Sequence, residues 1–394
     1  MNALSTRSRL PEPITYQVVV LADESADWKI AGLSQLTRLA FALDEFLQNE
    51  RANASATVVV RSKIDISSMQ PSPTLPRIAF APDLSSPPDL ILSTRLFFFR
   101  DGVKEFCERQ ARVLTKDVDL ADSKFDELDR FVRDIGSSPN KWQYIENQKQ
   151  IPPIEIAFLS AAGKSQDGLV AKYINRPISR RITRVLLHFP ITPNQWTVAT
   201  SLLALPACFL LADGSYSGIV AGAVCYQVIN ILDGCDGEIS RAKYLESERG
   251  RRFDAFCDLV LNLIFVLSLG IGLFRREQTE VRWVYLSEAV LSVSMVAVRL
   301  ARYARDLLSD ATTKLSPQHE TVIRTSGARF FGSGFTDWLF QMAKRDVAFF
   351  AFAILAVFGR APWILHCFFA FALGSLILSW KGRAAGDKID IAVQ

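Results

Sequence analysis

The sequence has few of the residues that the commonest metal and nucleophile sites require. It contains only three histidines, His188, His319 and His366, and they are far apart. Its six cysteines are scattered and include no C-x-x-C pair. We therefore expect no histidine-based metal site, zinc site, disulfide framework or Ser-His-Asp triad.

A strong charge of one sign and an apolar N-terminal leader are also missing. The formal net charge is +4, which is too small to indicate a nucleic-acid-binding protein, and no such motif is present. No nucleic-acid partner is therefore expected. The first residues lack the apolar core of a signal peptide, so we expect the chain to start in the cytosol.

The apolar residues are unevenly distributed along the 394 residues. Hydrophobic residues make up 49% of the chain and charged residues 22%, and the mean hydropathy is +0.16. Almost all long apolar runs follow Pro193. This distribution predicts a soluble N-terminal region and a membrane-embedded C-terminal region.

Residues 1–165 alternate strand-like and helix-like segments, which predicts a cytosolic α/β layer fold with a largely parallel sheet. We expect loops at the proline-containing stretches 71–88 and 152–153. The expected strands are 16–21, 57–60 and 90–92, and the expected helices are 33–47, 101–114 and 124–135.

Residues 166–192 have a basic amphipathic pattern that suits the surface of an anionic membrane. An ordinary surface helix packed on the soluble domain is the alternative. The bases that alternate with apolar residues are Lys172, Arg176, Arg180, Arg181 and Arg184.

Residues 193–394 predict six membrane-spanning helices, at 195–213, 216–233, 254–274, 283–301, 346–360 and 362–380. Most of the connecting segments rich in Lys and Arg would face the cytosol together with both termini. The link 275–282 carries three arginines on the opposite side, which counts against this topology.

Four aspartates lie where the second and third apolar segments meet. Asp233 and Asp236 are spaced i, i+3, and Asp254 and Asp258 are spaced i, i+4, so each pair lies on one helix face. Carboxylates at that depth are costly unless a cation compensates them, and oxygen ligands suit Mg²⁺, Mn²⁺ or Ca²⁺. With two bridged divalent ions, the residue types predict phosphoryl transfer at the cytosolic face. Between the pairs lie Gly237, Ser240, Arg241 and Gly250.

This run resembles the signature of the CDP-alcohol phosphatidyltransferase family, DxxDGxxARx₈GxxxDxxxD. Every position matches except that Ser240 replaces the usual alanine. The stretch Pro193, Asn194 and Thr197 also resembles the start of the family's first span, although a plain helix cap explains it nearly as well. The resemblance implies a six-helix membrane enzyme, usually a homodimer, which displaces CMP from a CDP-alcohol.

The resemblance also implies roles for the signature residues. Asp233, Asp236, Asp254 and Asp258 would hold two divalent ions, Mg²⁺ or Mn²⁺, and Asp258 would also be the general base toward the acceptor hydroxyl. The residues that would line the cytidine diphosphate site are Gly237, Ser240, Arg241 and Gly250.

The two-part organisation resembles a subgroup in which a nucleotidyltransferase-like domain precedes the membrane domain, the bifunctional inositol-phosphate cytidylyltransferase and di-myo-inositol-phosphate phosphate synthases. Such a domain needs a glycine-rich loop with a basic residue for the triphosphate. Residues 22–31 instead contain Asp23, Glu24 and Asp27 and no glycine, with Lys29 and Arg38 the only nearby cations. We expect a degenerate domain, with an active cytidylyltransferase as the alternative.

Arginines outside the signature are candidates for binding a phosphorylated acceptor such as inositol phosphate. Arg299 and Arg345 are the two that we select, and anchoring to lipid headgroups is the alternative role. The donor also stays open, because CDP-diacylglycerol, as in a phosphatidylinositol-phosphate synthase, competes with CDP-inositol. A non-enzymatic carrier or scaffold with the same fold is a third possibility.

Overall fold

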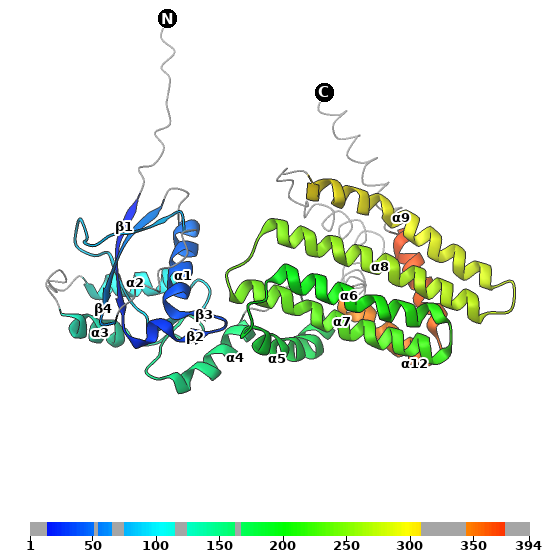
Figure 1. The fold of residues 1–394 in the computed structure, drawn as a ribbon, viewed down its shortest axis with the longest axis horizontal. Coiled ribbons are helices and arrows are strands. Elements are labelled where there is room, and N and C mark those ends of the chain that lie inside the picture. Colours follow the sequence, from blue (N-terminus) through cyan, green and yellow to red (C-terminus); the bar gives the residue numbers. More distant parts are fainter. Residues whose placement is uncertain are drawn as a thin grey trace, which may run out of the picture. The chain divides into compact units, whose positions relative to one another are not determined.

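The computed structural model describes residues 14–50, 54–64, 75–114, 124–161, 167–308 and 344–374 (Figure 1). Within residues 298–308 it describes the backbone helix and not the side chains. The chain divides into two compact units. One comprises Met1–Ala162 with Ala242–Tyr244, and the other Gly163–Arg241 with Leu245–Gln394. The boundary expected at residue 165 lies outside the described residues.

The N-terminal unit is built on a four-stranded sheet in the order β5-β4-β1-β6, and every pairing is parallel. Strand β1 is central because its run of valines and leucine is buried on both faces. The predicted parallel α/β fold of this region is confirmed. The strands are β1 (Thr15–Ala22), β4 (Ser55–Ser62), β5 (Ile78–Phe80) and β6 (Leu90–Ser93).

Helices pack against this sheet around one hydrophobic core that includes Leu43, Phe106 and Trp142. The longer helices are α1 (Gln35–Glu50), α2 (Gly102–Leu114), α3 (Phe125–Asp134) and α4 (Ile151–Ala161). The smaller elements are η1 (Glu24–Asp27), β2 (Lys29–Ile30), β3 (Leu33–Ser34), β7 (Leu96–Phe98), β8 (Trp142–Tyr144) and η2 (Gln148–Gln150).

Two loop predictions for this unit were wrong. The stretch 71–88 contains strand β5, which pairs at the sheet edge beside β4. Pro152 and Pro153 lie in the first turn of α4. Backbone N–H groups there have no partner inside the helix, so prolines are tolerated.

The C-terminal unit is helical. Three of its described helices are long and apolar enough to cross a membrane: α6 (Pro193–Asp213), α7 (Tyr216–Ala242) and α8 (Glu248–Arg276). The count of six spans stays a prediction. The other helices are η3 (Ala171–Asn175), α5 (Arg176–Leu186), α9 (Arg282–Leu308), α12 (Arg345–Val357) and the short apolar helix Ala361–Gly374.

Small residues allow these helices to approach closely. A Cβ added to Gly222 of α7 would lie 2.7 Å from the Ala207 carbonyl oxygen of α6, and one on Gly272 of α8 would collide with the Leu211 carbonyl. Close backbone approach at small residues is the usual way in which membrane helices associate. It fixes α7 and α8 beside α6, as Figure 1 shows, and these two helices carry the signature aspartates.

Candidate active site

The signature lies on the last turns of α7 and the first turns of α8. Asp233 and Asp236 belong to α7, and Asp254 and Asp258 belong to α8. Ser247 caps α8, and its hydroxyl accepts a hydrogen bond from the Gly250 N–H at 3.0 Å. A Cβ on Gly250 would lie 2.9 Å from that hydroxyl, so glycine at this position allows the tight start of α8.

Three of the four aspartates converge. Carboxylate oxygens of Asp233, Asp236 and Asp254 lie within 4.8 Å of one another. The Asp254 Oδ1 atom is buried and has no hydrogen-bond partner among the described residues. A buried carboxylate oxygen without a partner is costly in free energy. An all-oxygen set with one unsatisfied ligand atom fits a hard divalent cation such as Mg²⁺ or Mn²⁺.

The fourth aspartate is held by an arginine. Asp258 forms an ion pair with Nη1 of Arg345 at the start of α12, and the same nitrogen lies 3.3 Å from Oδ2 of Asp233. Arg345, selected from the sequence as an acceptor-binding residue, therefore contacts the aspartates directly. Arg299 lies in α9, within the stretch 298–308 whose side chains are outside the described residues.

The residues expected to bind cytidine diphosphate surround the same helix turns. Arg241 is 8% exposed, and a Cβ on Gly237 would lie 3.2 Å from its Nη1. Glycine therefore leaves room for the guanidinium beside the Asp236 turn. The Ser240 carbonyl accepts from the Leu245 N–H at 2.9 Å, which closes the C-terminal end of α7.

The start of α6 supports the cluster from a third helix. Thr192 caps α6 and Pro193 occupies its first turn. The Thr197 hydroxyl donates to Asp236 Oδ2 at 2.7 Å, and the Trp196 indole N–H donates to the Leu232 carbonyl at 2.8 Å. The motif at 193–197 thus caps the helix and also orients a signature aspartate.

Sequence reasoning missed Glu238, which is 2% exposed. The hydroxyls of Ser179 and Thr183 on α5 donate to its two carboxylate oxygens, each at 2.7 Å. Arg176 adds a third bond to Glu238 at 3.2 Å and one to the Gly234 carbonyl at 3.2 Å. These contacts attach α5 to the signature turn of α7. The i, i+4 spacing of the two hydroxyls was the available signal.

Arg176 is itself held by Asp167. Its Nε and Nη2 donate to the two Asp167 oxygens at 2.9 and 3.1 Å. Burial acts to lower the pKa of Arg176, but the carboxylates of Asp167 and Glu238 outweigh it and raise the pKa above its ordinary value. The guanidinium is therefore a permanent positive charge between two acids.

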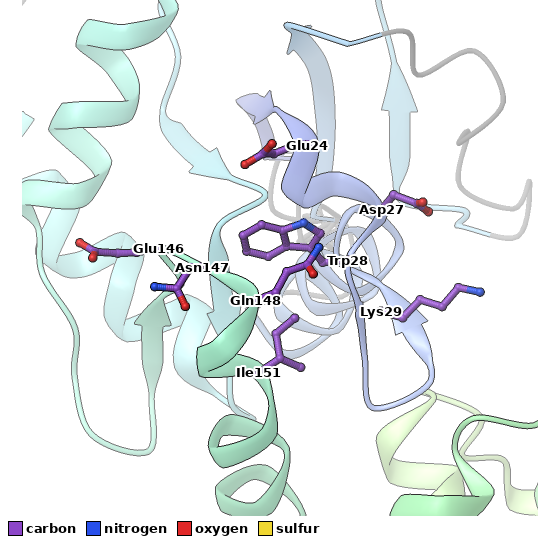
Figure 2. Close-up of a pocket in the computed structure, with 8 residues that line it drawn as sticks. All are labelled: Glu24, Asp27, Trp28, Lys29, Glu146, Asn147, Gln148 and Ile151. Carbon is purple, nitrogen blue, oxygen red and sulfur yellow. The ribbon is translucent and has the colours of Figure 1, made fainter.

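A second polar feature lies in the N-terminal unit, at the carboxyl ends of β1 and β6, where open α/β sheets usually bind ligands. Figure 2 shows a hollow with the Trp28 indole at its centre and Glu146 and Asp27 on opposite sides. Its volume is about 600 Å³. Its lining is Glu24, Asp27, Trp28, Lys29, Glu146, Asn147, Gln148 and Ile151.

Arg95 lies beside this hollow, and each of its three guanidinium nitrogens donates a hydrogen bond to a protein oxygen. It donates to Asp23 at 2.6 Å, to Glu24 at 3.2 Å and to the Glu146 carbonyl at 2.8 Å. It also lies 5.3 Å from the Trp28 ring centroid. The hollow's own lining carries three carboxylates and one ammonium group, a set that repels a triphosphate.

Residues 190–380 match a family model described as CDP-alcohol phosphatidyltransferase. The chain is similar to curated proteins named "Bifunctional IPC transferase and DIPP synthase". The protein from Rubrobacter xylanophilus is 34% identical over 158 residues, which cover 40% of this chain and 35% of that protein. The Archaeoglobus fulgidus protein is 32% identical over 131 residues, 33% of this chain and 26% of that protein.

A longer match is to the protein of that name from Aquifex aeolicus. It is 25% identical over 233 residues, 59% of this chain and 47% of that protein. The chain thus spans less than half the length of each of these curated relatives. The family match at residues 190–380 includes the four signature aspartates.

Proposed function

We propose that residues 190–380, which match the family model described as CDP-alcohol phosphatidyltransferase, transfer a substituted phosphate group from a CDP-alcohol to an acceptor hydroxyl and release CMP. The observation that carries this proposal is the convergence of the carboxylates of Asp233, Asp236 and Asp254 within 4.8 Å. They meet in a signature whose spacing the family shares.

Two divalent ions, Mg²⁺ or Mn²⁺, would be held by Asp233, Asp236 and Asp254 together with Asp258. When bound, such ions neutralise the charge of a diphosphate. Gly237, Ser240, Arg241 and Gly250 line the CDP side, where the buried Arg241 guanidinium suits a phosphate oxygen. Thr197 keeps the Asp236 carboxylate oriented by its hydrogen bond.

The reaction is a substitution at the β-phosphorus of the donor. Asp258 accepts the proton of the acceptor hydroxyl while that oxygen forms the new bond to phosphorus. The bond between this phosphorus and the oxygen that bridges to CMP breaks, and CMP leaves with the bonding electrons. The product is a phosphodiester that joins the two alcohols.

The test is CMP release by the purified protein with Mg²⁺, a CDP-alcohol and an acceptor. Asp258→Asn is expected to abolish CMP release while the protein stays folded. Asp213→Asn is the matched control, because Asp213 ends α6 and contacts Ser215 instead of the cluster. Unchanged turnover in Asp258→Asn would refute Asp258 as the base. Binding of metal without any CMP release from either donor class would favour a carrier or scaffold.

For the two alcohols we propose CDP-inositol as donor and inositol phosphate as acceptor, with Arg345 and Arg299 contributing to the acceptor phosphate. The support is the likeness to proteins named as IPC transferases and DIPP synthases. Labelled inositol phosphate is incubated with CDP-inositol or with CDP-diacylglycerol. A water-soluble labelled product is expected from the first, whereas a lipid-soluble product from the second would identify a phospholipid synthase.

We further propose that residues 1–165 form a degenerate nucleotidyltransferase-like domain that serves docking or substrate delivery. The support is the acidic lining of the hollow in Figure 2 and the engagement of Arg95 by acids. The full chain is expected to release no pyrophosphate from CTP and inositol phosphate. Pyrophosphate release would establish a second active site.

In the membrane, the aspartates and both termini are proposed to face the cytosol, with 166–192 lying on the membrane surface. The support for a surface helix is that α5 buries Ser179 and Thr183 and exposes Ile178 at 40% and Val185 at 61%. The support for the orientation is the richness in Lys and Arg of most segments that connect the apolar runs. A homodimer is proposed from the family resemblance. Labelling of single introduced cysteines in sealed vesicles tests the orientation, and cross-linking in membranes tests the dimer.

A further inference from the structure

One guanidinium nitrogen sits between two signature carboxylates. Arg345 Nη1 pairs with Oδ2 of Asp258 and lies 3.3 Å from Oδ2 of Asp233. The three side chains are between 20% and 28% exposed, so this pair is shielded from water more than a surface ion pair is. A charge-assisted hydrogen bond in such a place is worth more than a neutral one.

The backbone of Arg345 is fixed by its neighbour. Asp346 accepts a hydrogen bond from the Ala171 N–H at 2.6 Å, and a Cβ on Gly168 would collide with the Asp346 carboxylate. The first turn of α12 is therefore attached to the segment that precedes α5. With this anchor in place, Arg345 reaches the aspartates through its own long side chain.

Arg345 contacts carboxylates that the signature also offers to a divalent ion. Arginine keeps its charge at any physiological pH and accepts no hydrogen bonds, so it cannot share a carboxylate face with a cation at ligand distance. Asp233 already belongs to the converging trio, while Asp258 is turned to the guanidinium. A cation held by Asp233 and Asp258 would therefore compete with Arg345 for these carboxylates.

We propose that Arg345 is a resident counter-ion that occupies the place of the second cation and is exchanged for it when the site is loaded. This inference rests on the proposed function. The exchange replaces the guanidinium with the cation at Asp258, and it leaves the Arg345 side chain beside the cluster for a phosphate oxygen.

The test is direct Mn²⁺ binding to the full-length protein in detergent, measured from the electron paramagnetic resonance signal of free Mn²⁺. Arg345→Gln is expected to tighten the weaker Mn²⁺ site by at least about tenfold, because a competing charge-assisted hydrogen bond is lost. Arg345→Lys keeps a competing charge and should stay near the wild type. Lys344→Gln removes the same charge one residue away and should change the affinity less than about twofold.

An increase in affinity is informative because damage to the fold would weaken binding. Looser or unchanged Mn²⁺ binding in Arg345→Gln, with a melting temperature near that of the wild type, would overturn the inference. Equal tightening in Lys344→Gln would also overturn it, because the effect would then be one of general charge. If the wild-type protein bound no Mn²⁺, or if Asp254→Asn bound it as well, the proposed function itself would fail.

Discussion

Both units contain carboxylates paired with an arginine, but the two arrangements differ in whether a carboxylate oxygen stays without a hydrogen-bond partner. In the N-terminal unit, Arg95 donates to Asp23, Glu24 and a backbone carbonyl, and Asp23 also accepts from the Ser25 N–H. In the C-terminal unit, Arg345 contacts Asp233 and Asp258. There Asp254 Oδ1 stays without a partner among the described residues.

The difference separates a structural ion pair from a binding site. A carboxylate whose partners are all within the protein gains nothing from a ligand, whereas a buried orphan oxygen lowers its free energy by binding a cation. The hollow of Figure 2 has acids but places them at its rim, where solvent reaches them. Convergence and burial, and not acidity alone, distinguish the proposed active site.

The largest effect on CMP release is expected from removing the negative charge of Asp254. Asp254→Asn should lower CMP release by at least about a thousandfold, because the loss of a metal ligand removes charge stabilisation from the transition state. Steady-state CMP release at saturating Mg²⁺ measures it. Glu277→Gln, at the opposite end of α8, is the control. Wild-type turnover in Asp254→Asn would show that the aspartate cluster is no more a binding site than the ion pair of the N-terminal unit.

The anchor of α5 on Glu238 should have the next largest effect. Thr183→Val leaves Glu238 Oε2 without its 2.7 Å donor, and an unsatisfied buried carboxylate oxygen costs about 1–3 kcal/mol. We expect CMP release to fall by about tenfold and the Mn²⁺ affinity to weaken with it. Thr183→Ser keeps the hydroxyl and should restore both.

The Thr183 comparison separates positioning from packing. If Val and Ser at position 183 behaved alike, the hydroxyl would not orient the signature turn, and Glu238 would have no role in placing Asp233 and Asp236.

In the N-terminal unit, Arg95→Gln should affect stability and not catalysis. The Arg95 and Asp23 side chains are 16% and 17% exposed, and loss of their bond should destabilise the unit by about 1.5–3 kcal/mol. Differential scanning calorimetry measures the loss. CMP release by the folded variant should equal that of the wild type, and a catalytic defect would mean that this hollow takes part in the reaction.

The smallest effect is a pH dependence at Asp23. Burial acts to raise its pKa, but the hydrogen bonds from Ser25 and the Arg95 guanidinium outweigh burial and lower the pKa below its ordinary value. The stabilisation is therefore complete above the unfolded pKa of about 3.9 and is lost as the pH falls through the lower folded value. The difference in melting temperature between the wild type and Asp23→Asn should be constant from about pH 7 to 5 and shrink below about pH 4. A difference that grew on acidification would have the wrong sign.

The sequence predicted helices and strands best where one hydrophobic pattern extended over the whole element. The run YQVVVL is apolar except for Gln17, and it forms most of the central strand β1. The strand β5 (Ile78–Phe80) was missed because it is three residues long, lies among prolines and is an edge strand. The start of α4 was missed because Pro152 and Pro153 are breakers within a helix but are tolerated in its first turn.

The part of the site that depends on short intervals within one helix was predictable from the sequence. The i, i+3 and i, i+4 intervals placed each aspartate pair on one face, and the structure brings Asp233, Asp236 and Asp254 together. The contacts of Arg345 and of Thr183 could not be predicted, because 87 and 55 residues separate them from Asp258 and Glu238. Only the packing of α12 and α5 beside α7 and α8 creates these pairs.

The most direct test of the central claim is the location of Mn²⁺ in crystals of the full chain grown with a CDP-alcohol, by anomalous scattering. Two Mn²⁺ peaks are expected within about 2.2 Å of oxygens of Asp233, Asp236, Asp254 and Asp258, with the diphosphate bound to both ions. Mn²⁺ and the nucleotide in the hollow around Trp28, with none at the aspartates, would contradict the account.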